Sequence, residues 1–377
     1  MKILLDSTFP GGYAAGLEVW TQNLIHSLAA IDNINQYVIF GFFIRNFSHR
    51  KKTIHIPQQT NFSLYVKKLP RPFVVFLEDH NISVIEKLLL RQNIDIYHGT
   101  GYFLPCLKKI KGIVTIHGLD FAEMDTYWYK DKWYKNVPLY LKRADIVVTV
   151  SEYVKNSIVN NYKIPQEKII VVYPGISETF RIIENTTNGI DEKLNVYSPY
   201  ILTVATSIER KNLKRLLHAF SIVIKKIKNL NLVIIGNKEN FEKGLSEEIK
   251  NFNLKGKIIF PGYLNSKKLV YYYNKAEVFV FPSLYEGFGF PVLEAMACGC
   301  PVISSNVSAL PEITGSAAFL VNPYSPEEIA YAMEKVLVDR KKRNEMRKAG
   351  IEQAKKFSWE KTAEKMINLY NRIILFE

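Results

Sequence analysis

The strongest constraint on the fold is an alternation of short apolar runs with longer helical stretches, which occurs twice along the chain. In the first half, the runs Ile113 to Ile116 and Ile146 to Val150 are β-branched, of the kind that parallel sheets bury on both faces. Helical stretches fall between the runs, as at Leu17 to Ala30 and Glu152 to Asn161. Strands that alternate with helices indicate a doubly wound α/β domain.

A polar segment divides this alternation into two sets. Residues 184–198 contain no apolar run, and Pro174-Gly175 comes shortly before them. We therefore place an interdomain linker there. Beyond it, a second alternation begins at Tyr200 to Val204 and continues to Phe319 to Val321.

The two sets predict two domains, which is also the natural expectation for 377 residues. Each is expected to be a Rossmann-like, doubly wound parallel-sheet domain, one at 1–180 and the other at 195–356. A last helix, 358–377, begins at Ser358, a good N-cap residue.

Composition narrows the class of protein. An apolar content of 47% is ample for two cores and excludes a disordered chain. No apolar run is long enough to span a membrane, and the apolar start is too short for a signal peptide before Asp6 interrupts it. Three cysteines are a sparse and odd set, which suits a reducing cytoplasm and disfavours a zinc site.

The net charge of +14 favours anionic partners, namely phosphate-bearing substrates, an acidic membrane surface or nucleic acid. The charge is spread over short clusters and forms no long basic tail. We do not expect nucleic-acid binding, because the chain lacks basic residues interleaved with aromatic ones and lacks a recognition motif.

The chemistry is concentrated between Phe281 and Asn306, where the sequence reads as strand, glycine loop, short helix and strand. Such a loop presents backbone N–H groups at a helix N-terminus, where anions bind. Glu294 is expected in or near the first helical turn, where its carboxylate can accept hydrogen bonds from a ribose diol. Glu286, on the loop, can hold a second set of hydroxyls. A nucleotide sugar needs both kinds of group: hydrogen-bond donors for its phosphates and hydrogen-bond acceptors for its hydroxyls.

This segment resembles the E-x7-E signature of glycosyltransferase family 4, whose members are retaining enzymes of the GT-B fold. The resemblance implies two Rossmann-like domains that face a central cleft. It also implies that the final helix crosses back to pack on the first domain. A nucleotide sugar would be the donor, and a hydroxyl of a saccharide or lipid-linked molecule the acceptor.

A pair of cations follows the first strand of the second domain. Arg210 and Lys211 are placed at the carboxyl end of that strand, where α/β sheets bind ligands. Each can donate charge-assisted hydrogen bonds to phosphate oxygens. The stretch resembles the R-K-N segment of family 4, which implies that both bind the donor diphosphate and stabilise it as it leaves.

The first domain offers three further segments. Thr115 to Phe121 resembles the T-I-H-D-L-x-F segment of the family with glycine at position 118, which implies that His117 lies beside the transferred sugar. Gly16 to Thr21 looks like the G-I-G-x-Y-T pattern, with Glu18 and Trp20 as departures. His98, in a segment that resembles the acceptor side, is a weaker candidate, and a buried, hydrogen-bonded histidine is its other interpretation.

The resemblance thus implies two sets of site residues. The expected catalytic set is His117, Arg210, Lys211 and Glu286. The expected donor-binding set is Gly12, Gly16, Gly236, Tyr263, Gly287, Phe288, Gly289, Phe290 and Glu294. We expect no cofactor and no metal, because the chain has no Asp-x-Asp pair and cationic side chains would take the metal's place.

The motifs most resemble the mannosyltransferase subset, so GDP-mannose is the first expectation for the donor, in surface polysaccharide or lipopolysaccharide assembly. A UDP-sugar (glucose, galactose or N-acetylglucosamine) and a non-catalytic, sugar-nucleotide-binding partner subunit remain open. The resemblance implies front-face transfer with retention and no protein nucleophile. We expect a cytoplasmic protein at the inner face of the membrane, with acceptor contacts around 40–80 and 100–135. The aromatic run 127–134 is either a packing face or a platform for sugar or membrane.

Overall fold

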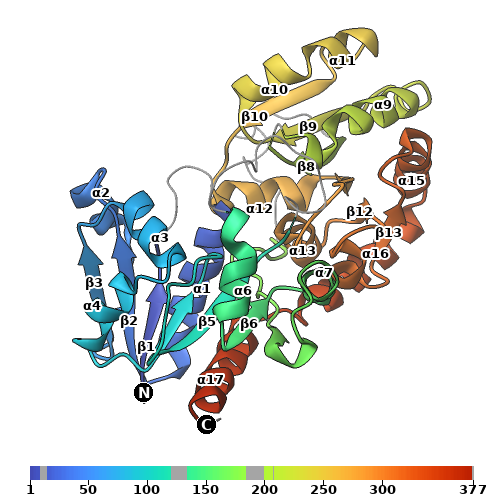
Figure 1. The fold of residues 1–377 in the computed structure, drawn as a ribbon. Coiled ribbons are helices and arrows are strands. Elements are labelled where there is room, and N and C mark those ends of the chain that lie inside the picture. The colour runs from blue at the N-terminus through green and yellow to red at the C-terminus, as the bar shows by residue number, and fades with distance from the viewer. Residues whose placement is uncertain (9–14, 120–133, 184–198, 207, 376–377) are drawn as a thin grey trace. The chain divides into compact units, whose positions relative to one another are not determined.

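The computed structural model describes residues 1–8, 15–119, 134–183, 199–206 and 208–375 (Figure 1). The chain divides into two compact units, one made of Met1–Gly175 with Ser358–Glu377 and the other of Ile176–Phe357. Every strand pairing in both sheets is parallel, so the expected pair of Rossmann-like domains is confirmed. The expected linker, 184–198, lies outside the described residues.

The first unit is built on a seven-stranded sheet in the order β3-β2-β1-β4-β5-β6-β7. Its central strands are buried on both faces, as their apolar runs require. The strands are β1 (Lys2–Asp6), β2 (Gln36–Phe42), β3 (Phe62–Lys67), β4 (Ile96–Gly99), β5 (Lys111–Ile116), β6 (Ile146–Thr149) and β7 (Ile169–Val171). The helices of this part of the chain are α1 (Ala15–Ile31), α2 (Phe47–Thr53), α3 (Arg71–Asp79), α4 (Val84–Leu90), α6 (Val137–Arg143) and α7 (Glu152–Tyr162).

The end of the chain returns to this first unit as α17 (Trp359–Leu375), which packs against α1. The Thr362 hydroxyl donates to the Tyr173 carbonyl oxygen over 2.7 Å, which ties the start of the helix to the unit. Further along, the Tyr370 hydroxyl meets Nδ1 of His98, at a distance of 2.8 Å. Helix α17 therefore belongs to the core of a domain that begins more than 350 residues earlier.

The second unit is built on a six-stranded sheet in the order β10-β9-β8-β11-β12-β13. Its strands are β8 (Tyr200–Val204), β9 (Asn231–Ile235), β10 (Ile258–Gly262), β11 (Val278–Phe281), β12 (Val302–Ser305) and β13 (Ala318–Val321). Its helices are α9 (Leu213–Val223), α10 (Lys238–Gly244), α11 (Ser246–Asn251), α12 (Ser266–Lys275), α13 (Phe290–Ala297), α14 (Leu310–Thr314), α15 (Pro326–Val338) and α16 (Arg340–Ala354). The strand order reverses between β8 and β11, the point at which such sheets bind ligands.

Among the helices that the structure describes, none combines the length and the apolar character needed to cross a membrane.

Candidate active site

The reversal of strand order in the second sheet brings two distant loops together. Arg210 and Lys211 lie on a short 3-10 turn, Glu209–Lys211, that follows β8. Glu286 lies on the loop that follows β11, the strand paired with β8. Parallel neighbours end at the same edge of the sheet, so the three side chains meet although about 75 residues separate them in sequence.

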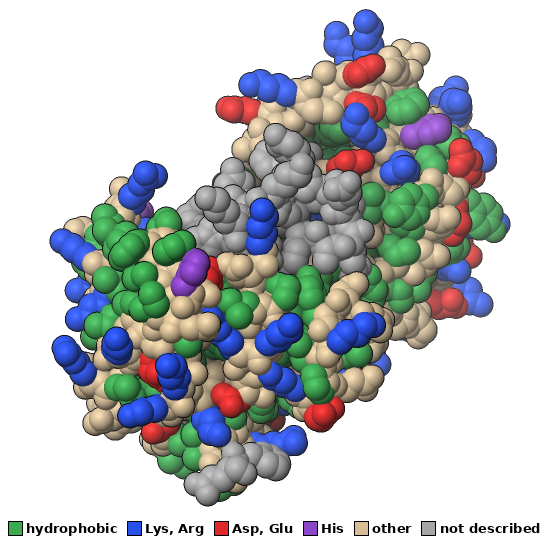
Figure 2. Space-filling model, viewed as in Figure 1, with side chains coloured by type: hydrophobic (Ala, Val, Ile, Leu, Met, Phe, Trp, Pro, Cys, Tyr) green, Lys and Arg blue, Asp and Glu red, His purple; other side chains and the backbone are tan. Residues whose placement is uncertain are grey.

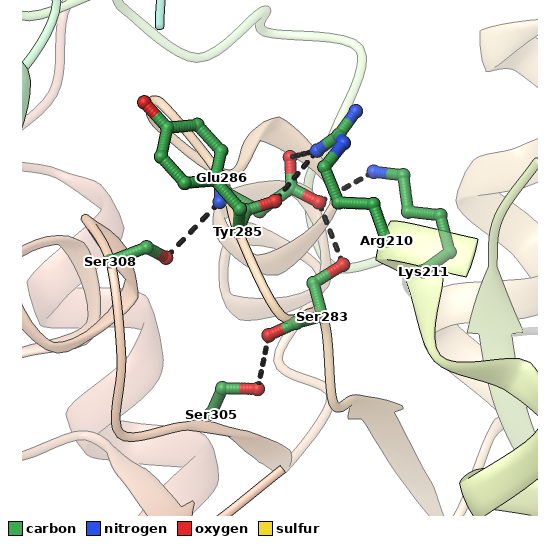
Figure 3. A network of polar contacts seen from close by, with 7 residues as sticks. All are labelled: Arg210, Lys211, Ser283, Tyr285, Glu286, Ser305 and Ser308. Carbon is green, nitrogen blue, oxygen red and sulfur yellow. Dashed lines mark hydrogen bonds and ion pairs between the residues drawn. The ribbon is translucent and has the colours of Figure 1, made fainter. Parts of the chain in front are cut away.

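The Glu286 carboxylate lies between the two cations, as Figure 3 shows. Arg210 Nη1 lies 3.0 Å from Oε2 of Glu286, and Lys211 Nζ lies 2.6 Å from Oε1. The Ser283 hydroxyl donates to the same Oε1 over 2.7 Å. The group is a compact cluster of two positive charges and one negative charge at the carboxyl edge of the sheet.

The charge state of Glu286 follows from these contacts. The residue is 8% exposed, and burial by itself would raise the pKa of its carboxyl. Arg210 and Lys211 outweigh that effect and, with the Ser283 hydrogen bond, hold the pKa at about 2. Glu286 is therefore ionised at neutral pH and is an acceptor for hydroxyl hydrogens.

Three serines that the motif does not name hold this loop in place. The backbone N–H of Glu286 donates to the Ser308 hydroxyl over 3.1 Å, and the Ser305 hydroxyl donates to the Ser283 carbonyl oxygen over 2.6 Å. Arg210 Nη1 also donates to the carbonyl oxygen of Tyr285 over 2.7 Å. The serine bonds join the β11 loop to the residues that end and follow β12, and the arginine bond joins it to the turn after β8. Ser283, three positions before Glu286, is the one a sequence pattern could have singled out.

The glycine loop leads directly into α13. Gly289 is the N-cap of that helix with φ 115°, and a Cβ there would lie 2.8 Å from Leu310 Cδ2, so only glycine fits. Gly287 lies on the same loop, between Glu286 and Phe288. Phe288 is 5% exposed and packs edge-on against Phe290, so its side chain is a packing element of the loop.

Glu294 is the fifth residue of α13, directly after the first turn, as expected. The Tyr273 hydroxyl, from α12, donates to its Oε2 over 3.0 Å. Loss of water around the carboxyl raises the pKa of Glu294 to about 7, against that hydrogen bond. The two glutamates of the motif thus differ in charge state, one fully ionised and one poised to titrate near neutral pH.

Gly236 and Tyr263 follow the two neighbouring strands β9 and β10. A Cβ on Gly236 would lie 2.1 Å from the Ala205 carbonyl oxygen and 2.6 Å from the Phe241 ring, so this position admits only glycine. The Gly236 N–H donates to the Gly262 carbonyl oxygen over 3.1 Å. Tyr263 directly follows this glycine and is 85% exposed.

His117 lies in the first unit, directly after β5. Its Nε2 lies 2.8 Å from the Thr100 carbonyl oxygen, which can only accept, so Nε2 carries the proton and Nδ1 is left with a lone pair. Burial lowers the pKa of His117 to about 4, so the ring is neutral at pH 7. Trp20 packs edge-on against it with ring centroids 5.2 Å apart and limits its rotation.

The other candidate residues in the first unit are Gly12, Gly16 and His98. Gly12 lies outside the described residues. Gly16 lies in the first turn of α1, and a Cβ there would meet nothing within 4 Å. His98 is fully buried, with Nδ1 at Tyr370 and Nε2 at the Thr115 hydroxyl, 2.7 Å away. Its acceptor-side role is wrong for this conformation, since it has no exposed surface, and the interpretation as a buried, hydrogen-bonded histidine holds.

Within the described ranges, no three side chains of His, Cys, Asp or Glu gather as they would around a metal ion. All three cysteines are buried free thiols.

Two family models together match nearly the whole chain. Residues 14–180 match the family model described as Glycosyltransferase Family 4, and residues 185–353 match the model described as Glycosyl transferases group 1. O-antigen chain mannosyltransferase B of Escherichia coli is 30% identical over 281 residues, which are 73% of this chain and 74% of that protein. The chain belongs to glycosyltransferase family 4.

Further relatives differ in length. O-antigen chain mannosyltransferase RfbU of Salmonella typhimurium is 30% identical over 261 residues, 67% of each chain. Serotype-specific mannosyltransferase WbdA of E. coli is 30% identical over 250 residues, which are 64% of this chain and 31% of WbdA. The chain therefore matches about a third of the length of WbdA.

Solved structures show the fold. A sucrose-phosphate synthase from Thermosynechococcus elongatus superposes with a TM-score of 0.78 at 20% identity, over 100% of both chains. WaaG, a glycosyltransferase involved in lipopolysaccharide biosynthesis, superposes with a TM-score of 0.71 at 15% identity, over 98% of this chain and 99% of WaaG. The chain has the GT-B fold of these enzymes.

Proposed function

We propose that this glycosyltransferase moves mannose from GDP-mannose to a hydroxyl of a saccharide or lipid-linked acceptor, in the assembly of a surface polysaccharide or lipopolysaccharide. The observation that carries the reaction type is the cluster of Arg210, Lys211 and Glu286 at the sheet's switch point. The choice of mannose is supported by relatives whose names are O-antigen mannosyltransferases.

Charge on the leaving group decides the roles of the two cations. The bond between the sugar's anomeric carbon and the diphosphate oxygen breaks, and the acceptor oxygen bonds to the same carbon on the same face. The acceptor's proton passes to the departing phosphate oxygen. Arg210 and Lys211 stabilise the negative charge that develops there, and such preorganised donors contribute about 10²–10³ in rate each.

The hydroxyls of the donor need hydrogen-bond acceptors, and the site offers carboxylates and a histidine nitrogen. The ionised Glu286 accepts from hydroxyls of the sugar, and Glu294 from the ribose. Neutral His117 contacts the sugar through the lone pair on Nδ1. Tyr263 and the backbone at Gly236 contribute to the nucleotide pocket. No residue is assigned as a nucleophile, because front-face transfer needs none.

We further propose that the reaction needs no metal and no cofactor. Two cationic side chains lie 3.0 Å or less from one carboxylate, at the place proposed for the diphosphate. Two fixed positive charges there supply what a divalent ion supplies elsewhere. The test is activity in EDTA.

Partners and location complete the proposal. Nucleic acid is not a partner. We place the protein in the cytoplasm at the inner face of the membrane, since a net charge of +14 favours an anionic surface.

Calorimetry with GDP-mannose, UDP-glucose, UDP-N-acetylglucosamine and their nucleoside diphosphates tests the donor. The proposal predicts selective binding of GDP-mannose that Arg210→Ala weakens. The exposed Arg340→Ala, on α16, serves as the control. Selective binding of a UDP-sugar would replace the donor and keep the reaction. Binding of no nucleotide would overturn the proposal in favour of a non-catalytic subunit.

A further inference from the structure

The surface beside α2 and α3 combines positive charge with exposed aromatic rings, and none of its residues has a role in the donor chemistry proposed above. Residues 44–77 contain seven lysines and arginines and no aspartate or glutamate. The cations are Arg45, Arg50, Lys51, Lys52, Lys67, Lys68 and Arg71, of which Arg71 is directed inward and donates to the Thr8 carbonyl oxygen. In α3, Phe73 is 58% exposed and Phe76 is 56% exposed. Soluble surfaces seldom place two such rings one helical turn apart without a partner.

The topology of the sheet gathers these groups on one surface. Helix α2 follows β2, α3 follows β3, and β2 pairs with β3 in parallel, so both helices begin at the same edge of the sheet. Lys68 Nζ lies 5.0 Å from the centroid of the Phe47 ring, which links the end of β3 to α2. Figure 2 shows hydrophobic side chains gathered over α2 and α3, with Lys and Arg side chains around them.

Helix α3 has two distinct faces. Val74, Val75 and Glu78 are buried against the unit, and Phe73 and Phe76 lie on the opposite side. The rings are therefore not part of the core. The two phenylalanines lie three residues apart in the helix, so both fall on its outer face.

The acidic residues of α3 do not offset the positive surface, because both are held by hydrogen bonds inside the unit. Glu78 accepts from the backbone N–H groups of Ile85 and Cys106, each over 2.7 Å. Asp79 accepts from the Tyr140 hydroxyl over 2.8 Å. The outer face is left with an excess of cations, which a nearby anionic surface would stabilise.

We propose that this α2–α3 surface, made of Arg50, Lys51, Lys52, Phe73 and Phe76, docks on an anionic lipid bilayer. Aromatic rings flanked by long cationic side chains match a bilayer's interface, where rings enter the boundary of the headgroups and cations meet lipid phosphates. The proposal identifies which surface of the protein contacts the membrane at the peripheral location proposed above. It rests on that location and not on the identity of the donor.

Co-sedimentation of the full chain with vesicles tests it, without nucleotide or saccharide lipid. One set of vesicles is pure phosphatidylcholine, and the other contains phosphatidylglycerol as well. We expect binding to the anionic vesicles that falls as salt is raised and is at least about tenfold weaker on the neutral vesicles. Lys51→Glu with Lys52→Glu, and separately Phe73→Ser with Phe76→Ser, should each lower the partition by about tenfold or more.

Two further variants control for the change in net charge and for the loss of an exposed aromatic ring. Lys341→Glu with Lys348→Glu makes the same charge change on exposed positions of α16, and Tyr331→Ser removes an exposed ring from α15. Both should bind as the unchanged protein does. Equal losses in the control variants, or equal binding to neutral vesicles, would overturn the proposal. Since nucleotide binding is measured separately, either proposal can fail while the other stands.

Discussion

Replacing Glu286 by glutamine keeps the shape of the side chain and removes one charge from the cluster. The contacts of Glu286 with Arg210 and Lys211 hold its pKa at about 2, below an ordinary value of 4.5. Each unit of pKa corresponds to about 1.4 kcal/mol. The ionised carboxylate is thus stabilised by about 3 kcal/mol at neutral pH, and the glutamine variant loses that contribution.

The variant should fold with reduced stability, bind nucleotide and fail in transfer. For a unit of this size, a loss of about 3 kcal/mol corresponds to roughly 6–12 °C in Tm. Nucleotide affinity should persist, because the diphosphate brings its own negative charge to Arg210 and Lys211. Transfer should fall by at least about 10²-fold, because a neutral amide is a weaker acceptor for the sugar's hydroxyls.

Three measurements on Glu286→Gln separate these effects: thermal unfolding, calorimetry with a nucleoside diphosphate, and the turnover of transfer. Glu345→Gln, an exposed carboxylate on α16, is the control and should behave as the unchanged protein. Unchanged turnover would refute the role of Glu286. A loss of nucleotide affinity as large as the loss of turnover would refute the division of labour between this carboxylate and the cations.

Other perturbations test the rest of the site. Arg210→Ala and Lys211→Ala should each weaken nucleotide diphosphate binding by about 1.5–3 kcal/mol in calorimetry, and equal affinity would contradict their assignment. The raised pKa of Glu294, about 7, predicts that affinity for a nucleotide sugar falls severalfold as pH drops from 8 to 6, and that Glu294→Gln removes this dependence. Its effect on stability has the opposite sign, because a raised carboxyl pKa makes folding more favourable as pH falls from 7 towards 4.5. Gly236→Ala should lower the free energy of unfolding by more than about 2 kcal/mol, since its Cβ meets a backbone oxygen at 2.1 Å, and a wild-type Tm would be inconsistent with that contact. EDTA should leave transfer largely intact, and a loss reversed by a divalent metal would show that the metal-free proposal is wrong.

The fold could be predicted because its signal is local. The β-branched runs at β5 and β6 mark buried parallel strands without any knowledge of their neighbours. The edge strand β3 was missed, since its burial pattern is mixed and its apolar residues form no continuous run. The helical stretch between β9 and β10 is divided into α10 and α11 at Leu245, directly after Gly244, whose low helix propensity favours the break.

The site could be predicted in part for a related reason. The loops that carry Arg210 and Glu286 end neighbouring strands, so the strand order alone brings them together. The serine contacts depend on the tertiary position of a loop 22 residues away: the side-chain hydroxyl of Ser308, a residue with φ 60°, accepts from the Glu286 N–H. Sequence spacing carries no record of such a contact. The exposed face of α3 is equally hard to predict, because Phe73 to Leu77 is a continuous apolar run that marks no single face of the helix.

Transfer of mannose is the most direct measurement of the proposed reaction. Radiolabelled GDP-mannose is incubated with the protein and a lipid extract that supplies acceptors, and labelled product and released GDP are measured together. The account predicts label in the saccharide product, one GDP for each mannose transferred, and loss of both in Glu286→Gln. Binding of GDP-mannose without transfer to any acceptor, with UDP-sugars equally inert, would contradict it.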